Sequence, residues 1–160
     1  MPGLIDLDAL TDAERQTIRR YALVQPALHG VTTYMPIASE VHSAWVEDRD
    51  ELIGMALASR ELGLHGYLGP SYRSGDNVAS RDGDRTVMFE PAVGEAGLQD
   101  ALGFPDWLEE LADPLVNGAL LPCRIETLPP VLLQDTAVAA RDRNVLVRLH
   151  NLQGSSSAAT

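Results

Sequence analysis

The sequence predicts an α/β fold in which parallel strands alternate with helices. Stretches with the apolar spacing of a helix face separate most of a series of short, strand-like runs. Strands that are joined through helices usually pair in parallel by right-handed crossovers. The runs are rich in β-branched, aromatic or other apolar residues and lie at residues 2–7, 31–35, 64–68, 119–121 and 145–150.

Two architectures fit this order of elements. One is an open doubly wound sheet, and the other is part of a (β/α)8 barrel. A complete barrel needs about 200 residues or more, whereas this chain has 160. We therefore expect a partial barrel of about five strand–helix units, in a single domain over residues 1–153, with the doubly wound sheet as the alternative. The small polar residues 154–160 are expected to form a disordered tail.

Capping residues and glycines predict the first helix boundaries. Residues 11–14, Thr-Asp-Ala-Glu, make a capping-box pattern that opens a helix running to about Leu28. A second helix is expected to begin at Asp48 or Asp50. It should end at Gly63, because glycine is the usual residue just beyond a helix C-terminus.

Later in the chain, proline and glycine mark the boundaries. Residues 73–89 contain an Asp-Gly turn and a short return strand, which predicts a hairpin. Helical pattern resumes near Gly94, and we expect it to break at residues 103–105, Gly-Phe-Pro, before continuing over 106–112. A last helix is expected over residues 129–142, because proline is tolerated in a first helical turn.

Composition excludes several classes of function. The net charge of -11 argues against nucleic acid, because phosphate contacts need a surplus of Lys and Arg, and against anionic membrane surfaces. No apolar run approaches the ~20 residues that span a bilayer, and the N-terminal residues lack the basic and apolar regions of a signal peptide. Cys123 is the single cysteine, which fits a reducing compartment, so we expect a cytoplasmic protein.

In either architecture, functional groups gather at the carboxyl ends of the strands. His29 and His65 precede strands, so we do not expect them to act in catalysis. Cys123 is better explained as a small buried hydrophobic residue than as a nucleophile. The polar residues that follow the five runs are Asp6, Asp8, Ser39, Glu40, His42, Tyr72, Arg73, Arg124, Glu126, Thr127, His150 and Gln153.

Several of these candidates have an equally simple structural explanation. Glu40 and His42 are consistent with a solvated loop pair, and Arg124 and Glu126 with an ion pair. His150 fits a core histidine bonded to the backbone as well as a ligand. The sequence contains no G-x-S-x-G elbow, P-loop, H-E-x-x-H or paired-cysteine metal motif, so no standard catalytic pattern decides between these readings.

Four segments, in order, resemble the amidohydrolase superfamily. Residues 2–6, Pro-Gly-Leu-Ile-Asp, resemble its first-strand motif, which His-x-His follows, and residues 30–33, Gly-Val-Thr-Thr, resemble its second strand. Residues 61–75 resemble the third-strand region of a chlorohydrolase- and deaminase-like branch. Residues 149–153, Leu-His-Asn-Leu-Gln, are similar to the fifth-strand His-x-x-Glu.

The resemblance implies a metal-dependent hydrolase on a (β/α)8 barrel, in which one or two divalent metals, zinc or iron, activate water for attack on a C–N or C–Cl centre. The two first-strand histidines fall on Asp8, which could bind a metal through oxygen, and on Leu10, which cannot. The fifth-strand ligand falls on His150. The proton-shuttling glutamate falls on Gln153, which cannot exchange a proton as a carboxylate does. The resemblance thus implies hydrolase ancestry with an incomplete metal site.

Two functions follow as expectations. The first is an amidohydrolase-like protein, truncated or divergent, with weak or no activity alone, whose pocket is lined by Glu40, His42, Tyr72, Arg73, Arg124, Glu126 and Gln153. The second is a non-catalytic binding or assembly protein that holds an anionic small molecule through Arg73 and Arg124. In both, the ligand is a small polar molecule. A partial barrel leaves strand edges uncovered, which predicts a homo-oligomer or pairing with another chain.

Overall fold

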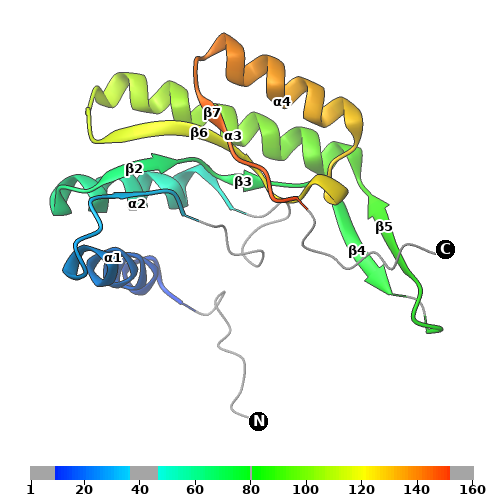
Figure 1. The fold of residues 1–160 in the computed structure, drawn as a ribbon, viewed down its shortest axis with the longest axis horizontal. Helices are drawn as coiled ribbons and strands as arrows, with labels where there is room; N and C mark the ends of the chain where they lie inside the picture. Colours follow the sequence, from blue (N-terminus) through cyan, green and yellow to red (C-terminus); the bar gives the residue numbers. More distant parts are fainter. Residues whose placement is uncertain (1–9, 37–46, 80, 152–160) are drawn as a thin grey trace.

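The structure is a computed structural model and describes residues 10–36, 47–79 and 81–151 (Figure 1). The strand expected at residues 2–7 and the tail expected at 154–160 lie outside these ranges. None of the helices in the described residues combines the length and the apolar character needed to cross a bilayer. The helices are α1 (Asp12–Leu28), α2 (Arg49–Leu62), α3 (Pro91–Leu111), η2 (Ile125–Thr127, a 3-10 turn) and α4 (Pro130–Asp142).

The strands form a parallel sheet whose order follows the chain. β1 pairs with β2, β2 pairs with the first half of β6, and β7 also pairs with β6, all in parallel. β3 follows β2 after two residues and pairs in parallel with the end of β6. The strands are β1 (Thr33–Tyr34), β2 (His65–Leu68), β3 (Ser71–Tyr72), β4 (Gly75–Ala79), β5 (Arg85–Phe89), β6 (Val116–Pro122) and β7 (Leu146–Val147).

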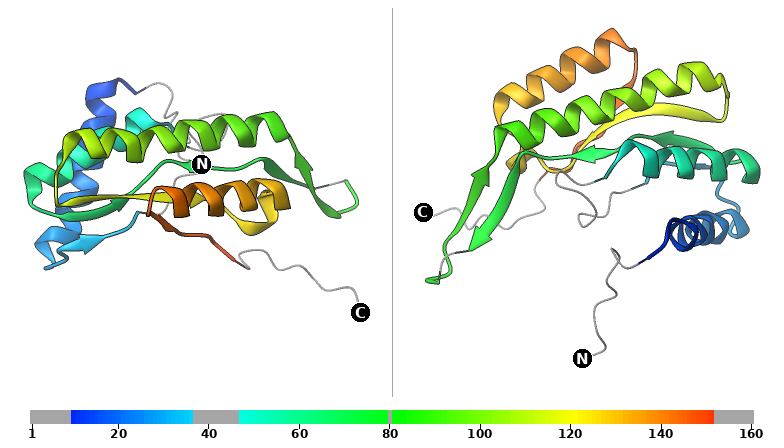
Figure 2. Two further views of the ribbon diagram at one scale, coloured as in Figure 1. Left: turned by 90° about the horizontal axis from the view of Figure 1, so that it is seen from above. Right: turned by 180° about the vertical axis from the view of Figure 1, so that it is seen from behind.

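All four long helices cover one face of this sheet. α1 contacts α2, α2 contacts α3, and α3 contacts α4, so the helices form one continuous layer, with the curved sheet beside it (Figure 2). A doubly wound sheet reverses its strand order once and places helices on both faces. The described strands show no such reversal. The fold is therefore the partial-barrel type, and the doubly wound alternative is not what the chain adopts.

The core lies between the helix layer and the sheet. One cluster joins α3 and α4 to β3 and β6 around Tyr72 and Leu120. A second joins α2 and α3 to β2 and β6 around Leu68 and Phe104. Both clusters lie on the face that the helices cover, which is therefore an apolar, buried face. The opposite face is the concave one.

The break expected at residues 103–105 does not occur. α3 runs without interruption from Pro91 to Leu111, with Pro105 inside it. Pro105 is buried, and its ring packs where Gly118 of β6 leaves room; a Cβ on Gly118 would lie 3.3 Å from that ring. A proline in a helix interior costs about 3 kcal/mol. Burial of the neighbouring Phe104 and Leu108 in the core offsets this cost.

The other helix and hairpin predictions are confirmed. Thr11 and Glu14 bond to each other in a capping box at the start of α1, and α2 ends at Gly63, which adopts a left-handed conformation with φ 69°. β4 and β5 pair in antiparallel fashion, and Gly83 has φ 90° between them. This two-stranded ribbon projects from one end of the molecule (Figure 1).

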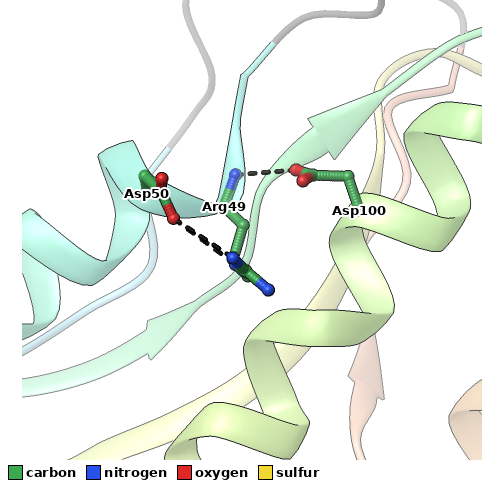
Figure 3. A network of polar contacts seen from close by, with 3 residues as sticks. All are labelled: Arg49, Asp50 and Asp100. Carbon is green, nitrogen blue, oxygen red and sulfur yellow. Dashed lines mark hydrogen bonds and ion pairs between the residues drawn. The ribbon is translucent and has the colours of Figure 1, made fainter.

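Acidic groups gather where α2 begins beside α3. The backbone N–H of Arg49 donates to Asp100 of α3 at 2.7 Å, and the Arg49 guanidinium pairs with Asp50 at 3.4 Å (Figure 3). The N-cap residue Asp48 lies close to these carboxylates and to Glu51. Partial burial and repulsion from the Asp100, Glu51 and Asp50 charges raise the pKa of Asp48 above its ordinary value.

Replacing Asp48 with Asn should therefore stabilise the protein at neutral pH. Because the folded-state pKa is raised, ionised Asp48 costs stability, and this cost grows as the pH rises above the ordinary value of 3.8. Asn is an equally good N-cap, so the variant loses only the charge. We expect a higher Tm than the unmodified chain at pH 7, and no difference in Tm well below pH 3.8. A pH series of thermal melts checks this; a gain that persists unchanged at low pH would contradict the electrostatic cause.

Candidate functional site

The carboxyl ends of β3, β6 and β7 meet at one edge of the sheet. The N–H of Cys123 donates to the carbonyl of Tyr72 at 2.9 Å, and the N–H of Ile125 donates to the carbonyl of His150 at 3.0 Å. Arg124 and His150 form a parallel bridge. Residues that are far apart in the sequence are thus brought side by side at the edge where parallel α/β folds place their functional groups.

Register and alternation show which side chains share the concave face. Leu120 of β6 packs with α3 in the core, so its neighbour Leu121 lies on the opposite face. Ser71 of β3 pairs with Leu121 on one side. Arg148 lies one residue beyond the Leu120–Val147 pair on the other side. Ser71, Leu121 and Arg148 therefore form a row across the concave face, and His150, two residues further, shares that face.

Tyr72 lies on the other face. Its side chain is fully buried in the core, and its hydroxyl lies 2.7 Å from the Thr136 hydroxyl of α4. Burial raises the pKa of the Tyr72 phenol well above its ordinary value, and the hydrogen bond with Thr136 opposes this only in part. The structure thus gives Tyr72 a role in packing the helix layer and does not bring it to the concave face with the other candidates.

The charged candidates at the rim are held in ion pairs. Arg73 pairs with Asp76 at 2.6 Å. Arg124 and Glu126 pair with each other at 3.9 Å, which is the structural alternative that their spacing suggested. These pairs lie just beyond the strand ends, so Arg73, Arg124 and Glu126 border the concave face with their charges already matched.

Arg148 is a component of the site that the sequence analysis did not select. Its Nη1 donates to the carbonyl oxygen of Pro36, which lies two residues beyond the end of β1. The side chain therefore reaches from the end of β7 across the concave face towards β1. Burial lowers the pKa of Arg148, while the nearby charges of Glu47 and Cys123 raise it. The sequence did contain an indication of this role, because Arg148 interrupts the apolar run 145–150. A charged side chain in a buried strand is rarely found without a polar or charged partner.

Glu47 is joined to the row through Ser71. The N–H of Ser71 donates to the Glu47 carboxylate at 3.2 Å, and the N–H of Glu47 donates to the Ser71 carbonyl at 3.1 Å. This pair anchors the segment before α2 to β3. Neither residue was among the candidates that the sequence indicated, because their proximity depends on a contact between segments 24 residues apart.

Three buried polar atoms at this site have no hydrogen-bond partner in the described part of the chain. They are Ser71 Oγ, Arg148 Nε and His150 Nε2. Buried polar atoms in folded proteins are nearly always bonded to protein, water or ligand. Their grouping on a single face is therefore the strongest indication of a ligand site in the described structure.

A metal site cannot be assembled from the described residues. They contain no group of three or more His, Cys, Asp or Glu side chains placed to hold one ion, whereas a protein zinc site normally has three or four protein ligands. His150 alone of the two expected metal ligands is described. The other candidates Asp8, Glu40, His42 and Gln153 lie outside the described residues. The donor set present here does not fit a divalent metal.

Comparison with known proteins shows the fold. The chain matches a triazine hydrolase variant with a TM-score of 0.60 and 23% identity, over 86% of this chain and 28% of that one. It also matches a mutant atrazine chlorohydrolase from Arthrobacter aurescens, crystallised with zinc and atraton, with a TM-score of 0.55 and 20% identity over 86% and 29%. No family model and no curated protein sequence matches.

These likenesses are of fold alone. The chain has a hydrolase-like fold, corresponding to a part of these enzymes, and spans less than a third of the length of the structures it matches. The likeness agrees with the chain-order parallel sheet and its single helix layer. What those enzymes bind and catalyse does not follow for this chain from the match.

Proposed function

We propose that the chain is a segment of an amidohydrolase-like barrel, descended from metal-dependent hydrolases of C–N or C–Cl bonds in small polar substrates, with weak or no hydrolase activity alone. The observation that carries this proposal is the convergence of side chains from three parallel strands on one concave face, in a fold like that of the triazine and atrazine hydrolases. A cytoplasmic location fits the single cysteine, Cys123.

We expect low activity because the chain lacks groups that metal-dependent hydrolysis needs. A bound metal such as zinc or iron would supply the activated water in this class of enzyme. Of the expected metal ligands, the described residues contain His150 alone, and the resemblance places Leu10 and Gln153 where a ligand and a proton shuttle are needed. Gln153 cannot take up and return a proton, so general acid–base catalysis would be lost as well.

An activity assay tests the proposal directly. The purified 160-residue chain, with and without added Zn²⁺ or Fe²⁺, should release ammonia or chloride from triazines no faster than buffer. Removing a member of a catalytic unit commonly costs orders of magnitude in rate. Metal analysis should find well under one ion per chain. Fast, metal-dependent turnover by this chain would overturn the expectation of weak or absent activity.

A second candidate function is non-catalytic binding of a small polar molecule at the same face. The three unpartnered atoms of Ser71, Arg148 and His150 favour it, because they offer bonds to a ligand without requiring a metal. Ligand binding in the presence of a chelator would separate this candidate from the hydrolytic one, since only the hydrolytic function depends on a metal ion.

A further inference from the structure

Arg148 is a cation on the concave face that is held in no ion pair in the described part of the chain. Within the described ranges no ion pair joins it to an acidic side chain, although eight other pairs are present there. The charge of Glu47 acts on it from a longer distance. A partly buried charge costs free energy unless it is paired and hydrogen-bonded. Arg148 therefore forms no direct ion pair with a described side chain, and the Glu47 carboxylate balances its charge only through space.

One edge of the Arg148 guanidinium group takes no part in its bond to Pro36. Nη1 is used in the bond to the Pro36 carbonyl. Nε is buried and has no partner in the described residues. The edge formed by Nε and Nη2 presents two parallel N–H donors, the arrangement that matches the two oxygens of a carboxylate.

Two further unpartnered atoms lie on the same face. Ser71, which is 1% exposed, is in the same row across β3, β6 and β7, and its Oγ is without a partner in the described chain. His150 follows Arg148 by two residues, and its Nε2 is likewise buried and unpartnered there. A hydroxyl and an imidazole N–H can both donate to a carboxylate oxygen. The face thus offers several donors and one positive charge that forms no ion pair with a described side chain.

We propose that Ser71, Arg148 and His150 form a binding site for a small monoanionic carboxylate. The Nε–Nη2 edge of Arg148 makes the bidentate contact, and the Ser71 hydroxyl and His150 Nε2 donate from the same face. The Glu47 carboxylate, bonded to the Ser71 N–H, repels dianions such as sulfate or phosphate more strongly than a monoanion, so it favours the smaller charge. This proposal rests on the proposed function, in that the concave strand-end face is the ligand-binding face.

Carboxylate binding can be measured on the full chain in the presence of EDTA. The probe is sodium acetate, titrated in calorimetry and in thermal melts against sodium chloride and sodium sulfate at matched ionic strength. We expect a saturable rise in Tm with acetate, no such rise with chloride and a weaker one with sulfate. Because no metal is present, the result is independent of whether the chain hydrolyses anything.

Variants identify the residues that bind. Arg148→Gln should weaken acetate binding by about tenfold or more, because it removes a charge-assisted bidentate contact. Arg148→Lys keeps the charge but loses the planar fork, so its affinity should fall between the two. Ser71→Ala should weaken binding by a smaller factor. Arg85→Gln, at an exposed position in β5, is the matched control and should bind acetate as the unmodified chain does.

The carboxylate could come from a free molecule or from an acidic side chain of another copy, and the particle mass distinguishes the two. A mass unchanged by acetate means a free ligand. Dissociation by acetate, with Arg148→Gln already dissociated, means that a second copy supplies the group. The proposal is overturned if acetate acts no differently from chloride, or if Arg148→Gln binds acetate as tightly as the unmodified chain. If Arg148→Gln does not fold, undiminished binding by folded Ser71→Ala and Arg148→Lys overturns it.

Discussion

Replacing Phe104 with Ala is expected to remove about 3–5 kcal/mol from the free energy of unfolding. Phe104 is fully buried in α3, packs in the cluster that includes Leu68 and Val116, and its ring centroid lies 5.8 Å from that of Trp107. The change leaves a cavity between the helix layer and the sheet. Because a typical domain has a stability of about 5–15 kcal/mol, the variant should be largely destabilised, as urea unfolding followed by circular dichroism will show.

Phe89→Ala provides the matched control. Phe89 is 45% exposed on the β4–β5 ribbon, so the same chemical change there should cost less than about 1 kcal/mol. Equal losses for the two variants would mean that the core does not lie between α2, α3 and the sheet. A small loss for Phe104→Ala alone would lead to the same conclusion.

The second large effect concerns association between chains. β7 pairs with β6, and no further strand follows it in the described residues. Apolar side chains are exposed in β7 itself, Leu146 at 53% and Val147 at 45%, and in α4, which contacts β7, Val138 at 46%. Exposed strand edges and apolar patches favour pairing between chains. Burial of about 300 Å² of apolar surface is worth about 7 kcal/mol, so we expect dimers or larger species, or pairing with another chain that supplies the missing strands.

Light scattering on the purified chain measures this association. Leu146→Lys should shift the particle mass towards the monomer, because a charge on an edge strand opposes pairing. Thr86→Lys adds the same charge on the distant β4–β5 ribbon and should leave the mass unchanged. Raising the salt concentration should favour association, because it screens the net charge of -11 on each copy. A stable, monodisperse monomer with little binding of a hydrophobic dye would contradict the prediction.

Local sequence determined most of the elements. Thr11 with Glu14 and Gly63 mark helix ends because caps act on backbone groups only a few residues away. The alternation of strand and helix predicted the parallel order, which the pairings of β1, β2, β6 and β7 confirm. The carboxyl-end rule also placed His150 and Arg124 at the edge where the structure joins them in a bridge.

Tertiary contacts decided the features that the sequence predicted wrongly or did not predict. Pro105 stays inside α3 because burial against β6 outweighs its poor helix propensity, a balance that only the packed structure sets. The site depends in the same way on register. A shift of one residue moves a side chain to the opposite face of a sheet, so Tyr72 packs among the helices while its neighbour Ser71 lies in a row with Arg148.

By itself, then, the sequence determined the kind and order of the elements and the edge of the sheet at which polar groups collect, because capping, periodicity and strand–helix alternation are local properties. Contacts between distant segments decided which of those groups share a face and which are paired. They also left Arg148 on the concave face without an ion-pair partner in the described chain. Such contacts are fixed by strand register and helix packing, which the folded structure alone sets.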